Sequence, residues 1–346
     1  MVLDAGASIL TVHGRTREMK GHKTGLADWS VIKYLREALG DEVVLFANGN
    51  ILKKEDLERC LRETGADGVM SAEGNLYDPG IFSTPPEVGE EGREYWRGRD
   101  GKGGWRMDAV FRRYMDILYT YVLESPIPTR KPLYLPSDLE PVEEVEEKEE
   151  GPERKKQKKD KKEKTTNPNL LSMQPHLFHL LRPLVSRHHY VRDALARCRA
   201  GDIAAFENVL QLVEGVVRDG LREYEESGGK SWEEEEKLSN AKLVEDKKKV
   251  EGKGDGEGEL DESSIETVRM CKRPWWVVQP YVRPLPKEAL ATGSLTLSKK
   301  EKNALEVANG KSIKGEGENG HVEVEVMGNG MEKVEIEVPK EGLVCG

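Results

Sequence analysis

The first 82 residues alternate short apolar runs with longer segments that carry apolar residues three or four positions apart. Short apolar runs predict buried strands, and the longer periodic segments predict helices. The expected elements are a strand at Ser8–Val12, a helix at Trp29–Leu39, a strand at Val43–Ala47, a helix at Lys54–Glu63 and a strand at Gly68–Ser71. Strands separated by helices run parallel. The pattern therefore predicts an α/β fold whose strands have helices on both faces or line a closed barrel.

A polar, glycine-containing cluster follows each predicted strand. The clusters are His13-Gly14-Arg15, Asn48-Gly49-Asn50 and Ala72-Glu73-Gly74-Asn75. Each has a simpler interpretation by itself: a histidine in a loop, an Asn-Gly turn and the entry to a helix. However, the carboxyl ends of parallel strands meet at one edge, where functional groups collect. Three such clusters favour a site for a phosphate-bearing cofactor, because glycines let backbone N–H groups approach an anion.

Farther along the chain, ordered patterns alternate with charged runs. Helical periodicity predicts helices at Met107–Leu123 and near 176–187, 189–199 and 202–223. An acidic run followed by a basic one predicts a disordered linker within 125–168. Its segment RKKQKKDKKEK is also typical of a nuclear localisation signal or an RNA-binding arm. An acidic insertion at 225–264 and a polar tail at 291–346 are expected to be mostly disordered, with a hairpin around the Gly-Asn-Gly of the tail.

Composition narrows the class of protein. Charged residues make up 34% of the 346 residues, hydrophobic residues 36%, and the net charge of -10 is segregated into blocks. The four cysteines form no metal-ligand spacing. No apolar stretch approaches the roughly 18 residues that span a bilayer. We expect a reduced, cytoplasmic and/or nuclear protein with no membrane or metal partner; the oligomeric state is not predicted.

Two downstream segments are candidates for RNA contact. A short interval is rich in cationic side chains, enough to meet an RNA backbone through counterion release; the alternative is a basic helix surface with internal acidic partners. These candidate RNA-binding residues are Arg182, Arg187, His188, Arg192, Arg197 and Arg199. The second segment, CKRPWWVVQPYVRPLP, carries Trp275, Trp276 and Tyr281. These rings either stack bases or pack onto the helices as a clasp, which the prolines favour.

Three segments together resemble the tRNA-dihydrouridine synthases, specifically the eukaryotic tRNA-dihydrouridine(16/17) synthase branch. They are LTVHGRTREMKGHKTGLADWSVIKYL, VLFANGNILKKEDLERCLRETGADGVMSAEGNLYDPGIF and RPWWVVQPYVRPLP. The resemblance implies a TIM barrel that carries FMN, followed by an all-α tRNA-binding domain. It also implies the reduction of uridine in tRNA, with hydride passed from NADPH or NADH through the flavin while a cysteine acts as general acid.

The resemblance also implies roles for individual residues. The cofactor-binding residues would be His13, Arg15, Asn48, Gly49, Asn50, Ala72, Glu73 and Gly74. His13 would lie against the flavin, and Arg15 would contact the flavin edge, the uridine or a structural partner. Two positions depart from the family pattern. Asn50 replaces an acid, and Glu73 stands where bacterial members carry arginine, so Glu73 is expected to point away from the phosphate.

The family's general-acid cysteine belongs to a strand that precedes the matched ones, and no segment of this chain matches it. By the resemblance, this cysteine would lie upstream of Met1, and Met1 would be an internal start. Cys60 lies on the apolar face of a predicted helix and is expected to be a core residue. We therefore expect the C-terminal portion of a TIM barrel, without a catalytic residue and inactive by itself. The alternatives are a non-catalytic RNA-binding protein of the same descent and, less favoured, another FMN-binding barrel such as an enoate reductase.

The expected organisation combines these elements into six parts, with long disordered insertions between the ordered ones. They are a partial FMN-binding barrel with its following helix at 1–124, a charged linker at 125–168, a helical tRNA-binding domain at 169–224, an acidic insertion at 225–264, an aromatic and proline-rich clasp at 265–290 and a tail at 291–346.

Overall fold

A computed structural model describes residues 2–19, 21, 24–138, 165–251 and 263–296. Its first part is a three-stranded parallel sheet of β1 (Ile9–His13), β2 (Val44–Asn48) and β3 (Gly68–Met70), in that order. Helices α1 (Trp29–Leu39) and α2 (Lys54–Thr64) connect the strands. These five elements confirm the predicted α/β alternation.

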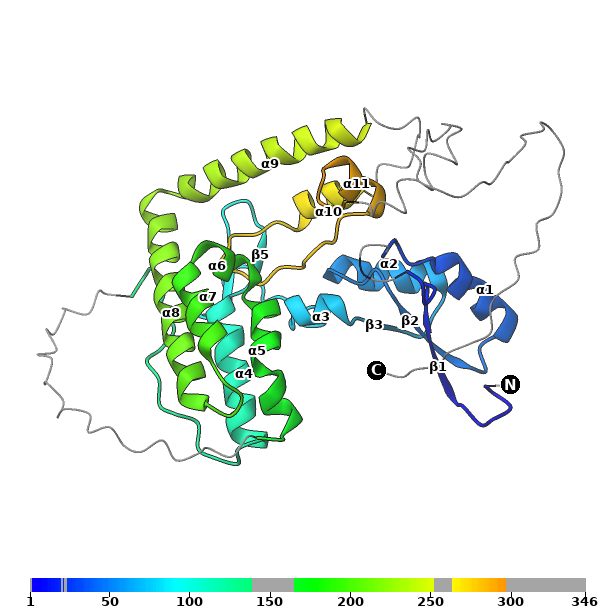
Figure 1. Cartoon of the computed structure of the whole chain (residues 1–346), viewed down its shortest axis with the longest axis horizontal. Coiled ribbons are helices and arrows are strands. Elements are labelled where there is room, and N and C mark those ends of the chain that lie inside the picture. The colour runs from blue at the N-terminus through cyan, green and yellow to red at the C-terminus, as the bar shows by residue number, and fades with distance from the viewer. Residues whose placement is uncertain (1, 20, 22–23, 139–164, 252–262, 297–346) are drawn as a thin grey trace, which may run out of the picture. The chain divides into compact units, whose positions relative to one another are not determined.

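The two helices lie together beside the sheet (Figure 1). Their apolar faces and one face of the sheet form a small core, in which Ile32, Leu45, Ala47 and Cys60 are almost completely buried. Burial raises the pKa of the Cys60 thiol to about 11, so this thiol remains protonated at neutral pH. Cys60 is thus a core residue, as its position on the helix predicted.

The opposite face of the sheet is open among the described residues. Ile9 pairs with Val44, so their side chains share this face, and Met70 pairs with Asn48 of the same set. The exposed fractions of Ile9, Val44 and Met70 are 54%, 40% and 41%. The described residues form no closed barrel, and helices cover only one face. Neither helices on both faces nor a closed barrel is found among the described residues, and the expected C-terminal portion of a barrel stays a prediction.

The second part is mostly helical. After α3 (Glu73–Tyr77) comes a hairpin of β4 (Tyr95–Arg97) and β5 (Gly103–Trp105), which sequence analysis missed. The helices that follow are α4 (Met107–Tyr121), α5 (Pro168–Leu180), α6 (Arg182–Arg187), α7 (His189–Arg197), α8 (Ile203–Glu226), α9 (Lys230–Glu251), α10 (Ser264–Cys271) and α11 (Pro286–Ala291).

Helices α4 to α8 share one large apolar core. Fully buried members include Phe111 of α4, Leu177 of α5 and Phe206 of α8. Trp275 and Trp276 are 7% and 4% exposed and meet edge to face, 5.2 Å between ring centroids. The segment around them extends the β4–β5 hairpin, because the N–H of Val278 donates to the carbonyl of Trp105 at 2.9 Å. Both tryptophans therefore lie in the core, and neither is open for base stacking.

The expectation of a disordered insertion at 225–264 is wrong for residues 225–251. Helix α9 covers Lys230–Glu251, and Trp232 near its start is 7% exposed in the helical core. Ion pairs hold the same end: Lys102 with Glu236 at 3.1 Å and Arg187 with Glu235 at 2.6 Å. These partners are distant in sequence, so local composition does not reveal them. Residues 252–262 lie outside the described part of the chain.

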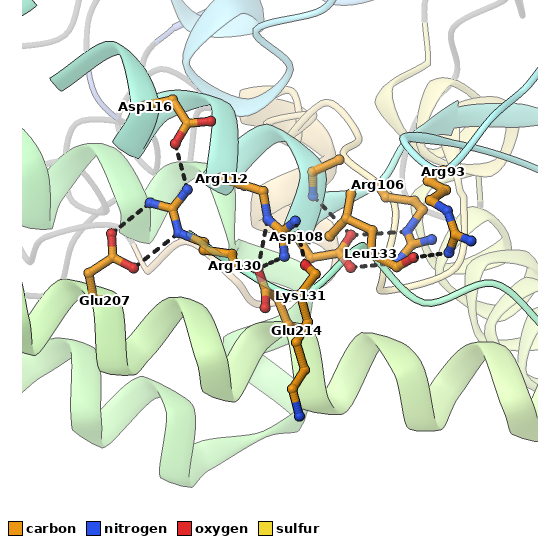
Figure 2. A network of polar contacts seen from close by, with 11 residues as sticks. Arg93, Arg106, Asp108, Arg112, Asp116, Arg130, Lys131, Leu133, Glu207 and Glu214 are labelled. Atoms are coloured by element: carbon orange, nitrogen blue, oxygen red, sulfur yellow. Dashed lines mark hydrogen bonds and ion pairs between the residues drawn. The ribbon is translucent and has the colours of Figure 1, made fainter. Parts of the chain in front are cut away.

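The expected linker at 125–168 also begins with a fixed segment. A network of arginines ties residues 124–138 to α4 and α8 (Figure 2). Arg130 binds Asp116 at 2.5 Å and Glu207 at 2.7 Å. Arg112 pairs with Glu214 and also donates to the carbonyl of Lys131.

Some predictions concern residues that the structure does not describe. The linker at 139–164 and the hairpin in the tail fall on such residues. Met1 is also among them, and the general-acid cysteine is expected upstream of it. The described residues therefore do not test whether Met1 is an internal start, and the position of that cysteine stays a prediction.

Candidate functional site at the strand ends

The carboxyl ends of β1 and β2 are directly linked. His13 pairs with Asn48 across the two strands, and the Gly14 N–H donates to the Asn48 carbonyl at 3.2 Å. Gly49 has a φ of 113°. A Cβ at Gly49 would lie 2.6 Å from the Ala27 Cβ and 3.0 Å from the His13 ring. Glycine is therefore required here both by its backbone conformation and by the imidazole packed against it.

Asn50 and Arg15 hold the loop that precedes α1. The Asn50 Oδ1 accepts from the Ala27 N–H and from the Arg15 guanidinium, both at 2.8 Å, while its Nδ2 donates to the Ala27 carbonyl at 2.9 Å. The Arg15 Nε donates to the Gly25 carbonyl at 2.6 Å. Asn50 thus has a positioning role that an acid could not fully reproduce, because a carboxylate has no N–H to donate.

The third strand end is joined to the second and to a distant segment. The Ser71 hydroxyl donates to the Ile51 carbonyl at 2.8 Å, and a Cβ at Gly74 would lie 2.4 Å from that carbonyl oxygen. Glu73 accepts a hydrogen bond at 2.7 Å from Nε of Arg283, which lies 210 residues downstream. Sequence analysis expected Glu73 to point away, whereas its carboxylate faces a cation beside the site.

A cavity of about 700 Å³ lies at these strand ends. Of the eight predicted cofactor-binding residues, Arg15, Asn50 and Glu73 line it. His13, Asn48, Gly49, Ala72 and Gly74 are not among its lining residues. Of these, His13 pairs with Asn48, and its ring lies next to Gly49, the residue before Asn50. Tyr281 and Arg283 form another part of the wall. They belong to the segment predicted to stack bases or to pack onto the helices, and neither was predicted to bind the cofactor. Their only signal was the aromatic, proline-rich segment that contains them.

Burial and charge shape the electrostatics of this cavity. Partial burial, and then the charge of Arg15, lower the pKa of His13, so its imidazole is neutral at pH 7. Partial burial also lowers the pKa of Arg15; Glu73 opposes this shift and Arg283 adds to it. The hydrogen bond to Glu73 raises the pKa of Arg283. Both arginines remain charged at neutral pH.

The predicted RNA-binding residues lie in different surroundings. Arg182 stacks over the Tyr281 ring at 3.9 Å from its centroid, so it lies beside a residue of the cavity wall. Arg187 pairs with Glu235, and Arg192 with Asp193 at 3.2 Å. The His188 ring packs on Trp275 at 4.5 Å. Arg197 and Arg199 are exposed at the end of α7 and just beyond it.

A second cavity, of about 380 Å³, lies between the 78–83 segment, the β4–β5 hairpin and residues 270–280. Asp78, Cys271 and Arg273 are among its lining residues. Burial raises the pKa of Asp78 to about 6, although its Oδ1 accepts a hydrogen bond from the Gly80 N–H. Among the described residues, no group of three or more metal-ligating side chains gathers.

Residues 1–98 match the family model of dihydrouridine synthase (Dus). This range contains all three strand ends and all eight predicted cofactor-binding residues. Over this range the chain matches the dihydrouridine synthase family, and relatives of that family support the match. Within the described residues, no helix is both long and apolar enough for a membrane span.

The relatives point to one branch. The chain is 35% identical over 286 residues to the tRNA-dihydrouridine(16/17) synthase [NAD(P)(+)] of Schizosaccharomyces pombe, covering 82% of this chain and 52% of that protein. It is 54% identical over 118 residues to the Saccharomyces cerevisiae protein of the same name, covering 34% and 26%. A mouse tRNA-dihydrouridine(16/17) synthase [NAD(P)(+)]-like protein is 51% identical over 96 residues, covering 28% and 20%. The chain thus spans about half the length of the fission-yeast relative.

Proposed function

We propose that this protein serves the FMN-dependent, NAD(P)H-driven reduction of uridine to 5,6-dihydrouridine in the D-loop of tRNA. The proposal rests on one observation: the same residues line a cavity and lie within the match to a known family. The cavity at the parallel strand ends is lined by Arg15, Asn50 and Glu73, and all three lie within the match to dihydrouridine synthases. Relatives named for the 16/17 activity support the choice of substrate.

The residues present fit a flavin mononucleotide. A volume of about 700 Å³ is within the range of cofactor pockets. Arg15, Lys53, Arg59 and Arg283 place positive charge on its wall, which suits a phosphate, and carboxylates such as Glu55 and Glu63 line other parts of it. When bound, FMN would carry hydride from the nicotinamide to the uridine ring. Arg15 and Asn50 would hold the 25–27 loop as one wall, and the neutral imidazole of His13 would support the Asn48–Asn50 turn from β1.

We propose that Arg182, Arg197 and Arg199 contact tRNA phosphates. We further propose that the surface beside Tyr281 determines which D-loop uridine is bound. All three are exposed, and Arg182 lies over Tyr281 at the cavity wall. Arg187 and Arg192 are already paired with carboxylates and are expected to contribute less. This assignment separates RNA contact from the ion pairs that stabilise the helices.

A non-catalytic RNA-binding protein is the second candidate, and one observation favours it. None of the three described cysteines, Cys60, Cys198 and Cys271, lines the cavity at the strand ends. Each is buried, and burial is the main cause that raises the pKa of each thiol. None of them is therefore placed or poised to donate a proton to a base in that cavity.

One experiment separates the two candidates. The purified 346-residue chain is mixed with FMN, its absorption spectrum is recorded after desalting, and it is then incubated with NADPH and an unmodified tRNA transcript. A retained flavin spectrum and a gain of two mass units on a D-loop uridine support the enzyme. Binding of the transcript without flavin supports the second candidate. Arg182→Glu should weaken transcript binding, whereas the matched control Arg218→Glu, on the exposed side of α8, should leave it unchanged.

A further inference from the structure

Arg182, the first residue of α6, places its guanidinium over the ring of Tyr281, with 3.9 Å from Cζ to the ring centroid. A distance this short sets the planar cation against the face of the ring. Arg182 is exposed, whereas Tyr281 is partly buried and lines the cavity at the strand ends. The inner member of this stack therefore belongs to the cavity wall, and the outer member reaches solvent.

The ring beneath Arg182 is held from its other side. Tyr281 contacts the Tyr77 ring of α3 with 5.3 Å between ring centroids and 42° between ring planes. Tyr77 is almost completely buried, and the His179 ring of α5 meets it edge to face at 4.9 Å. Because these contacts fix Tyr281, the guanidinium stacked on it is oriented before a ligand arrives, which lowers the entropy lost on binding.

The charge of Arg182 sets it apart from similar arginines. In the described part of the chain, the arginines that lie over aromatic rings are Arg59, Arg97, Arg182 and Arg187. The first, second and last of these also form salt bridges with carboxylates, at 2.6–3.4 Å. Among the same described residues, Arg182 forms no salt bridge. Its N–H groups and its outer face are therefore open to a ligand.

A planar cation backed by an aromatic ring fits one ligand chemistry best. Unpaired RNA bases stack on aromatic rings and on guanidinium planes, and their edges accept hydrogen bonds. A phosphate alone would use the N–H groups of Arg182 but not its face. The stacked geometry therefore favours a nucleobase over an isolated anion.

We infer that Arg182, backed by Tyr281, stacks an unpaired nucleobase that flanks the uridine proposed to enter the cavity. The inference rests on the proposed tRNA substrate and gives Arg182 a role beyond phosphate contact. Tyr281 lines the cavity and Arg182 does not, so the stacked base lies outside the cavity beside its wall. A base held there cannot stack on the neighbouring uridine, which lowers the cost of extruding that uridine.

Two simpler roles for Arg182 make different predictions. If Arg182 only fastened the segment around Tyr281 to α6, Arg182→Lys would lower stability, and RNA binding would not depend on the flanking bases. If Arg182 only contacted a phosphate, Arg182→Lys would bind RNA as the wild-type chain does, because lysine keeps the charge. Stacking requires the guanidinium plane, which lysine lacks.

The test uses the full chain and two probes, titrated by fluorescence anisotropy. One probe is an unmodified tRNA, and the other is the same tRNA assembled with abasic nucleotides on both sides of the D-loop uridine. Arg182→Lys should weaken binding of the unmodified tRNA about tenfold, within the range for one stacked base. Its salt dependence should not change, because the number of charges is the same.

The abasic probe completes the cycle. It should bind the wild-type chain about tenfold more weakly than the unmodified tRNA does, and Arg182→Lys should bind both probes equally. The matched control is Arg197→Lys, at an exposed arginine of α7 that lies over no aromatic ring among the described residues. This variant should bind each probe as the wild-type chain does.

The other results contradict the inference. An unchanged affinity of Arg182→Lys for the unmodified tRNA, or an equal loss of affinity for both probes, overturns it and leaves the proposed function standing. A wild-type chain that binds neither probe overturns both the inference and the proposed tRNA contact. If Arg182→Lys fails to fold, Tyr281→Leu and Tyr281→Phe replace it: weaker binding in the first alone supports the inference, and equal binding by the two variants contradicts it.

Discussion

The α/β part and the helical part of this protein are stabilised in different ways. The α/β part has a small core around Ile32 and Leu45, an open sheet face and loops held by side-chain bonds to backbone carbonyls. The helical part has a large aromatic core and several arginine–carboxylate pairs. The candidate site therefore lies on the part with less burial, where loop geometry depends on a few polar side chains.

The largest loss of stability is expected when a buried charge is removed from the helical part. Arg106 and Asp108 are 2% and 1% exposed and are joined at 2.5 Å. Asp108→Ala leaves a buried guanidinium without its partner and should cost about 3–5 kcal/mol in the free energy of unfolding. Urea denaturation followed by tryptophan fluorescence measures this. The exposed control Asp219→Ala should change the unfolding free energy by less than about 0.5 kcal/mol; similar losses in both would contradict the prediction.

A substitution that leaves a void in the core of the α/β part should lower stability less but reduce flavin binding more. Ile32 is fully buried in α1, and Ile32→Ala should cost about 2–4 kcal/mol. Because α1 begins at the loop held by Asn50, FMN retention should also fall. Its neighbour Val31 is 48% exposed and provides the control Val31→Ala. Hydrogen exchange should show faster opening of β1 and β2 and unchanged protection in α8.

A substitution of Arg130 tests the arginine–carboxylate pairs that hold the segment at 124–138. Arg130→Gln removes the charge that binds Asp116 and Glu207, and it should cost about 1–2 kcal/mol because the pairs are largely buried. Limited proteolysis should then cut within 124–138 sooner than in the wild-type chain. An unchanged cleavage rate would show that the hydrogen bonds from Arg112 and Arg106 to backbone carbonyls are sufficient to hold the segment.

An effect of similar size on stability, which depends on pH, is expected at Asp78. The pKa of Asp78 is raised to about 6, so the folded state holds this proton more tightly than the unfolded state does. Stability from this group is present below about pH 4 and is lost as pH rises towards pH 6 and above. Asp78→Asn should raise the melting temperature at pH 7 by an amount that corresponds to about 1–2 kcal/mol and flatten its pH dependence. Asp41→Asn, fully exposed, should leave that dependence unchanged.

The amino-acid sequence predicts the structure correctly where the signal is local. Apolar runs and helical spacing located β1, β2 and β3 with α1 and α2, and parallel topology brought His13 next to Asn48. It failed where partners are distant. Nothing near Glu73 in sequence indicates Arg283, and the polar helix α9 is held by Trp232 and by ion pairs to other elements. Glycine-rich composition likewise hid the β4–β5 hairpin, whose pairing is completed by Val278.

The pairing of the β4–β5 hairpin with the segment around Trp275 and Trp276 delays completion of the core while the chain is being synthesised. Arg273 donates to the Gly103 carbonyl across 170 residues, and Trp276 completes the core that α4 and α8 share. A ribosome that adds roughly 5–20 residues per second needs about 10–30 s to proceed from Gly103 to Arg273. During this interval the growing chain carries an unfinished helical core, so it is then that a chaperone would have the most apolar surface to bind.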